Sequence, residues 1–167
     1  MAELLSFTRD AVQQLSASLN EPRWMLDLRL RAWEVYASMP VPTPQDEAWR
    51  RTDIRRLKLD ALGPSLNGNG GDGAAIPDYL GAQLTDDAAG GVLVEANGVL
   101  KSYELSDELR AQGIIFCDMH TAVREHGDLV RRHFMTHAVR VEEGKFAALH
   151  GAFWRGGVFL YVPRNVV

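Results

Sequence analysis

Four of the five histidines and the single cysteine are the residues whose chemistry could serve a reaction or a metal site. They are His120, His126, His133, His137 and Cys117. The pair His133 and His137 has i,i+4 spacing, which on a helix would place both imidazoles on one face. A metal site would need a third ligand, and no carboxylate of the HExxH type lies between them. We therefore favour two partly exposed histidines over a metal-binding pair.

Cys117 lies in the apolar stretch "IIFCD", which predicts a buried strand. A thiol in such a strand is usually a small buried hydrophobe, whereas a cluster ligand or persulfide acceptor needs an exposed, electropositive setting. A single cysteine also excludes an intrachain disulfide and a cysteine-rich zinc or iron–sulfur site within one chain. A reducing compartment suits this composition, so we expect the cytoplasm.

Two further stretches could bind ligands, but each also has a purely structural explanation. The glycine-rich "GNGGDG" has no following Lys-Ser/Thr and no flanking strand and helix, so we favour a linker over a phosphate-binding loop. In "WRRTD", the candidate binding residues are Trp49, Arg50, Thr52 and Asp53. We favour a structural role, in which Trp49 packs against the helix of residues 22–38 and Thr52 and Asp53 end a turn.

The polar residues make no recognisable catalytic set. There is no Ser/His/Asp order, no nucleophile elbow and no carboxylate pair that stands out from the composition. We therefore predict that the chain is not an enzyme and has no catalytic, cofactor-binding or metal-binding residues. A weaker alternative is an enzyme whose metal is held by some of the four histidines.

The composition and net charge indicate which classes of partner are not expected. The formal net charge of −4 gives no reason to expect nucleic acid. No apolar run reaches about 18 residues, so no membrane span is expected. The N-terminus has no basic region followed by an apolar core, so it does not read as a signal peptide.

Residues 1–62 are expected to form a helical region. Apolar spacing predicts a first helix capped by Ser6 and a second helix over residues 22–38. Asp27 and Arg31 have the i,i+4 spacing of an ion pair on the solvated side of the second helix. The prolines of "MPVPTP" must end that helix, because each removes a backbone donor.

The chain is then expected to pass through a short helix into a linker. Thr43 is a plausible cap for the short helix, and the alternation of Ile54–Leu59 suits a short extended segment. Residues 63–77 are rich in glycine and asparagine and predict a linker, with residues 64–75 mobile.

Residues 78–156 are expected to form a mixed α/β region. The predicted elements are a hairpin turning at Asn97-Gly98, a short helix ended by Gly113, the strand "IIFCD", a helical stretch opened by Asp118 or Thr121 and interrupted at Gly127, and the helix "EEGKFAALHGAFW". A closing strand, Val158–Val162, follows in residues 157–167.

Three stretches of the chain resemble the SufB/SufD family of iron–sulfur cluster assembly proteins. They are "DEAWRRTDIRRL", "GIIFCDMHTAVREHGDLVRRHF" and "KFAALHGAFWRGGVFLYVPRNV", in the family's order. The helical N-terminus with its proline-rich exit is more similar to the SufD branch than to the SufB branch. The chain departs from the family pattern at Arg51, Arg155 and Asn165, where an aromatic residue, a serine and a glycine are usual.

The resemblance implies an α+β fold in which a helical N-terminal region leads into a right-handed parallel β-helix. It implies that residues 157–167 begin that β-helix and that the chain is the N-terminal segment of a longer scaffold subunit. By the same resemblance, the subunit acts in a complex with SufB and the ATPase SufC, and its cluster-assembly residues lie outside this segment, which holds no cofactor. The alternative is a stand-alone helical adaptor without catalytic activity.

The closing strand is apolar at every position of Val158–Val162, which predicts burial of both its faces. Since no further strand follows it, we expect it to pair through residues 156–163 with a second copy of the chain, or with the hairpin of residues 92–104. Phe153 and Trp154 are expected to be core under the first coil of the β-helix or, in a chain that lacks this coil, an exposed apolar edge.

Overall fold

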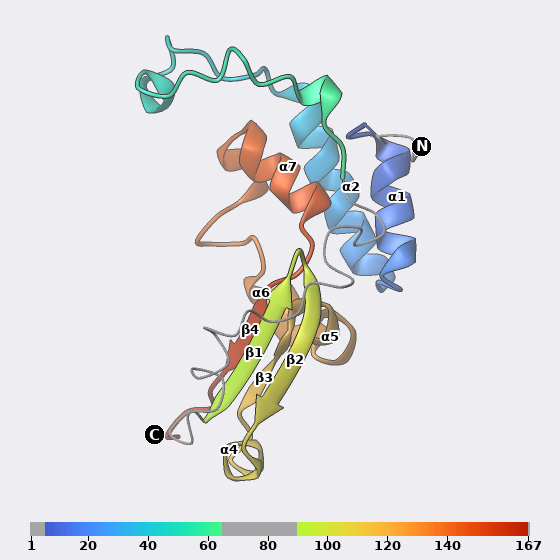
Figure 1. Ribbon diagram of the computed structural model, residues 1–167, viewed down its shortest axis with the longest axis vertical. Coiled ribbons are helices and arrows are strands. Elements are labelled where there is room, and N and C mark those ends of the chain that lie inside the picture. The colour runs from blue at the N-terminus through green and yellow to red at the C-terminus, as the bar shows by residue number, and fades with distance from the viewer. Residues whose placement is uncertain (1–5, 65–89, 167) are drawn as a thin grey trace. The chain divides into compact units, whose positions relative to one another are not determined.

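The computed structural model describes residues 6–64 and 90–166, which divide into two units (Figure 1). The first unit holds residues 6–64 and 128–154, and the second holds residues 90–127 and 155–166. The units therefore do not follow the order of the chain, whereas the boundaries predicted from the sequence ran consecutively. The predicted linker lies outside the described residues except at its first two positions, and the prediction that it is mobile stays open.

Three helices form the framework of the first unit: α1 (Arg9–Ser18), α2 (Arg23–Ser38) and α7 (Lys145–Phe153) (Figure 1). Helix α1 is capped by Thr8, whose hydroxyl accepts a hydrogen bond from the backbone N–H of Ala11 at 3.1 Å. The predicted cap Ser6 is therefore wrong by two residues. Helix α2 begins after Pro22 and ends before the proline-rich stretch, as the sequence predicted.

The core of the first unit forms where α7 lies against α2. Val12, Ala32, Val141 and Ala152 are its buried centre. Gly151 permits the close approach, since a Cβ there would lie 2.8 Å from Val141 and 3.0 Å from Ala32.

The ion pairs on α2 differ from the predicted one. Arg31 pairs with Glu142, and Asp27 pairs with Arg23 at 2.9 Å. The predicted Asp27–Arg31 pair is therefore wrong. Arg31 has a partner in a distant part of the sequence, which local spacing could not reveal.

The remaining elements of the first unit are short. They are the 3₁₀ turns η1 (Glu47–Trp49), η2 (Leu59–Ala61) and η3 (Val141–Glu143), and helix α6 (Gly127–His133), which begins at the predicted interruption. The predicted extended segment Ile54–Leu59 is instead a turn, closed by the Leu57 N–H on the Ile54 carbonyl at 2.9 Å, followed by η2. No strand of the described residues lies there to pair with it, and an isolated extended segment has no ladder to stabilise it.

The second unit begins with the predicted hairpin, β1 (Gly91–Ala96) and β2 (Val99–Leu105). Asn97 and Gly98 have φ values of 52° and 76°, as a type I′ turn requires, so this prediction is confirmed. Helix α4 (Asp107–Ala111) follows, capped by Ser106.

The second unit is completed by β3 (Ile115–Asp118), α5 (Met119–Glu125) and β4 (Val158–Tyr161). Strand β4 pairs antiparallel with β3, so the expected pairing of the closing strand with the hairpin is wrong. The hairpin strands already pair with each other, and the hairpin instead contacts β3 through Tyr103 and Phe116, whose ring centroids are 6.2 Å apart.

The α+β class predicted from the sequence is confirmed. All strand pairs among residues 6–64 and 90–166 are antiparallel, and no coil of a parallel β-helix is formed by these residues. In the same residues, no helix is both long enough and apolar enough to cross a membrane.

Candidate functional site

Strand β4 is the most exposed apolar element of the second unit. Val158, Leu160 and Tyr161 have exposed fractions of 53%, 61% and 38%, and Val162 just beyond them has 49%. The burial expected for both faces of this strand is therefore not supplied by the described residues. Only one edge of β4 is paired by a described strand, so its other edge offers backbone donors and acceptors beside an apolar surface.

Phe159 is the exception in this strand because it faces the body of the second unit. It lies opposite Cys117 in the β3–β4 register, and its ring stacks with that of His126 at a centroid distance of 6.4 Å. Strand β4 is therefore held by one aromatic side chain and by its pairing with β3, while its other side chains are available for contact.

The turn that leads into β4 is fixed by two hydrogen bonds from its glycines. The N–H of Gly156 donates to Nε2 of His120 at 3.2 Å, and the N–H of Gly157 donates to Glu95 at 2.7 Å. Gly156 has φ +84°, and a Cβ at this position would collide with the Glu95 carboxylate. Glu95 and His120, to which the sequence analysis gave no structural role, thus set the direction in which β4 starts.

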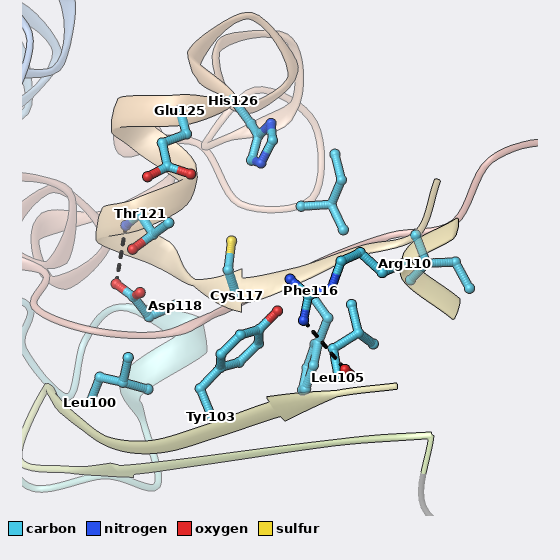
Figure 2. Close-up of a pocket in the computed structure, with 12 residues that line it drawn as sticks. Leu100, Tyr103, Leu105, Arg110, Phe116, Cys117, Asp118, Thr121, Glu125 and His126 are labelled. Carbon is cyan, nitrogen blue, oxygen red and sulfur yellow. Dashed lines mark hydrogen bonds between the residues drawn. The ribbon is translucent and has the colours of Figure 1, made fainter. Parts of the chain in front are cut away.

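A pocket of about 370 Å³ lies between the hairpin, β3 and α5 (Figure 2). Its lining includes Leu100, Tyr103, Arg110, Phe116, Cys117, Asp118, Glu125 and His126. The polar groups are spread around the rim: Arg110 donates to the Leu105 carbonyl at 3.3 Å, and Asp118 caps α5. Arg110 and Asp118 are thus engaged with the protein itself.

Cys117 is buried in this pocket, with 9% of its surface exposed. Burial, together with the nearby carboxylates of Asp118 and Glu125, raises the pKa of its thiol to about 11. The group is therefore a neutral thiol at physiological pH, whereas a nucleophile or metal ligand must be a thiolate. This agrees with the prediction of a small buried hydrophobe.

The structure does not bring the predicted histidine pair together on one helix. Helix α6 ends at His133, and His137 lies beyond it in an irregular segment, so the i,i+4 geometry predicted for them is wrong. His120 and His126 belong to the second unit and have the structural contacts described above. Among residues 6–64 and 90–166, no three His, Cys, Asp or Glu side chains are gathered as metal ligands would be.

The "WRRTD" stretch has the structural role that was favoured, with a different packing partner. The ring of Trp49 contacts Phe146 of α7, at a centroid distance of 5.2 Å. Arg50 pairs with Glu47 at 3.0 Å, and the N–H of Thr52 donates to the Trp49 carbonyl at 2.9 Å, which closes the predicted turn.

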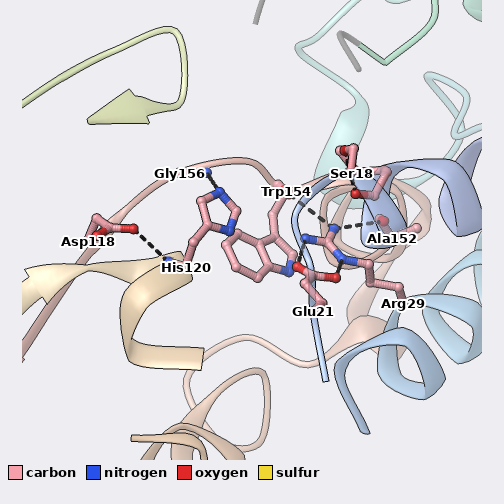
Figure 3. A network of polar contacts seen from close by, with 9 residues as sticks. Ser18, Glu21, Arg29, Asp118, His120, Ala152, Trp154 and Gly156 are labelled. Atoms are coloured by element: carbon pink, nitrogen blue, oxygen red, sulfur yellow. Dashed lines mark hydrogen bonds and ion pairs between the residues drawn. The ribbon is translucent and has the colours of Figure 1, made fainter. Parts of the chain in front are cut away.

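A buried ion pair in the first unit was missed by sequence reasoning (Figure 3). Arg29 and Glu21 form two hydrogen bonds, of 2.6 and 2.7 Å, and their side chains are 0% and 1% exposed. The same guanidinium donates to the carbonyls of Ala152 and Trp154 and lies 4.5 Å from the centroid of the Trp154 ring. The available signal was an arginine between Met25 and Ala32 on the apolar face of α2.

Comparison with known proteins identifies the family. The family described as SufBD protein N-terminal region matches residues 83–167. The iron-sulfur cluster assembly protein SufD of Bacillus subtilis is 35% identical over 166 residues, which cover 97% of this chain and 37% of that protein. The chain belongs to the SufBD family.

Two other relatives show the same partial coverage. The iron-sulfur cluster assembly protein SufB of Bacillus subtilis is 30% identical over 95% of this chain and 35% of its own length. A SufBD family protein of Mycobacterium tuberculosis, Rv1461, is 31% identical over 93% of this chain and 19% of its own length. The chain thus spans about a third or less of the curated relatives that it matches.

The geometry explains one position at which the chain departs from the SufBD pattern. Asn165 has φ +65°, the left-handed conformation for which glycine is the usual residue and which asparagine tolerates best among the others. The structure gives no reason for the arginine at position 155, which precedes the Gly156–Gly157 turn.

Proposed function

We propose that this chain is the N-terminal region of a SufD-like scaffold subunit that acts in a complex with a SufB-like and a SufC-like protein in iron–sulfur cluster assembly. The observation that supports this role is the match to SufD over 97% of the chain. The cluster is the cargo of the complex, and this region needs no cofactor of its own.

Strand β4 has the properties of a strand that a further part of a longer protein covers. Its side chains Val158 and Leu160 are more than half exposed, and one of its edges is not paired by a described strand. Burial of such side chains contributes about 25 cal/mol per Å² of apolar surface removed from water. We therefore place the first coil of the parallel β-helix against β4.

A role without catalysis agrees with the chemistry of the described residues. The Cys117 thiol is neutral, and Arg110 and Asp118 of its pocket form hydrogen bonds within the protein. A scaffold needs surfaces that position partners and does not need an activated nucleophile. The cytoplasm remains the expected location, and the alternative of a stand-alone adaptor is not favoured by the family match.

Co-purification tests the scaffold role. The gene product that carries this chain would be tagged and co-expressed with the SufB-like and SufC-like proteins of the same genome. We expect the three proteins to elute together in size-exclusion chromatography. A gene product that is folded by circular dichroism but elutes alone would contradict the proposal.

A further inference from the structure

A second candidate surface lies on the first unit, in the segment that follows α2. Residues 50–58 carry five basic side chains and one acidic side chain, although the whole chain has a net charge of −4. Arg51, Arg56 and Lys58 are exposed, and none of the three forms an ion pair with a described residue. Arg50 and Arg55 are paired with Glu47 and Asp53, and the positive charge of the other three side chains is left for a partner.

The turn at Ile54–Leu57 arranges this charge around apolar side chains. Arg55 and Arg56 occupy its two central positions. Arg55 is held by Asp53, which accepts hydrogen bonds from its backbone N–H, Nε and terminal guanidinium nitrogen at 2.8–3.0 Å. Asp53 is the one carboxylate of residues 50–58, and it is paired with Arg55. The guanidinium of Arg56 can therefore pair with a ligand.

Two hollows lie side by side next to this turn. The first, of about 570 Å³, is lined mainly by Tyr36, Val41, Leu57, Lys58, Asp60 and Lys145. The second, of about 350 Å³, is lined mainly by Val41, Pro42, Pro44, Ile54, Arg55 and Leu57. Val41 and Leu57 contribute to both hollows and are 47% and 42% exposed, so they form an apolar ridge between them.

The cations at these hollows differ in their availability. The Nζ of Lys145 donates to the carbonyls of Tyr36 and Met39 at 2.8 and 2.7 Å and is therefore engaged. Lys58 lines the same hollow, is exposed and has no such partner among the described residues. An incoming carboxylate would therefore be attracted to Lys58, which lines the first hollow, and to Arg56 in the adjoining turn.

We propose that this surface, named here the 41–62 groove, docks an acidic segment of a partner protein whose carboxylates alternate with at least two large apolar side chains. The apolar side chains occupy the two hollows on either side of the Val41–Leu57 ridge, and the carboxylates meet Arg56 and Lys58. Charge complementarity selects an acidic partner and speeds its association. Nucleic acid fits less well, because the two hollows are lined largely by aliphatic side chains and the chain as a whole is acidic.

Site-specific photo-crosslinking in cells tests this docking. A benzophenone amino acid would replace Leu57 in the full gene product, and the crosslinked peptide would be identified by mass spectrometry. Val139, which is 49% exposed on the same unit, is the matched control position. We expect capture at position 57, and not at 139, of an acidic peptide from a different protein. Capture of nucleic acid, of a second copy or of the chain's own residues would overturn the proposal, as would equal yields at the two positions.

Affinity measurements with the captured peptide complete the test. Fluorescence anisotropy would compare the wild type, the double variant Arg56→Glu/Lys58→Glu, and the control variant Arg9→Glu, an exposed charge elsewhere on the same unit. We expect about tenfold weaker binding by the double variant, wild-type affinity for the control, and weaker binding at high salt. Unchanged affinity of a double variant with a wild-type circular dichroism spectrum would overturn the proposal. Because co-purification with SufB-like and SufC-like proteins is a separate readout, either proposal can fail without the other.

Discussion

At the scale of single residues, the Arg29–Glu21 pair shows how one charged contact can organise a core. The guanidinium satisfies a carboxylate and two carbonyls from the end of α7 while it lies over the Trp154 ring. Each buried charge would be costly alone, and the pair is tolerated because its hydrogen-bonding capacity is used. The contact therefore links Arg29, in the N-terminal half of α2, to the C-terminal end of α7.

Replacement of Arg29 by leucine should strongly destabilise the first unit. The change leaves Glu21 buried without a partner, and removal of one member of a buried pair costs about 3–5 kcal/mol. Arg31→Leu is the matched control, because Arg31 and Glu142 form an exposed ion pair, which contributes little to stability. Urea unfolding would measure both variants, and equal destabilisation by the two changes would contradict this account.

At the scale of elements, the start of α5 depends on one side chain. The sequence left Asp118 and Thr121 as alternative residues to open this helix, and the structure selects Asp118. Its Oδ1 accepts hydrogen bonds from the N–H groups of His120 and Thr121 at 3.0 and 3.1 Å. Burial raises the pKa of Asp118, but the hydrogen bonds from Thr121 and His120 outweigh this effect and lower the pKa below its ordinary value.

Replacement of Asp118 by alanine should cost about 1 kcal/mol, and replacement by asparagine should cost less, because asparagine still caps the helix. The sign of the pH dependence follows from the lowered pKa. The charged cap stabilises fully above the unfolded pKa of about 3.9, and this contribution is lost as the pH falls through the lower folded pKa.

Thermal melts at several pH values would check both effects. The wild type should lose stability below about pH 4 more steeply than Asp118→Asn, which has no carboxylate to protonate. Identical acid profiles of the two proteins would show that this carboxylate does not contribute.

At the scale of the whole molecule, β4 is the element on which the prediction of self-association rests, because its apolar side chains are exposed. Self-association through residues 156–163 remains a prediction, and the structure indicates which side chain should test it. Phe159 is stacked on His126, so a charge there would also disturb the second unit. Leu160, with 61% of its surface exposed, is the better position.

The chain of residues 1–167 should self-associate at high concentration, and Leu160→Lys should reduce this. A lysine at the contact carries its charge into a desolvated interface, at a cost of about a few kcal/mol unless it is paired. Sedimentation velocity would compare this variant with the control Val139→Lys on the other unit. A wild type that remains monomeric, or two variants with the same effect, would refute the prediction.

The sequence by itself determined the elements whose signals are local. The Asn97-Gly98 turn, the end of α2 before its prolines, the interruption at Gly127 and the strand around Cys117 all follow from backbone preferences and apolar periodicity. The resemblance carried by the three long stretches identified the family, because an ordered set of motifs is far more specific than any one of them.

Only the tertiary structure decided which elements meet. The pairing of β4 with β3, the partner of Arg31 and the burial of Arg29 each join residues distant in the sequence. Such contacts depend on which surfaces are brought together, and nothing in local spacing encodes them. The end of α6 was likewise not visible in the spacing of His133 and His137. Two histidines at i,i+4 share a face only while the helix continues, and α6 ends at His133.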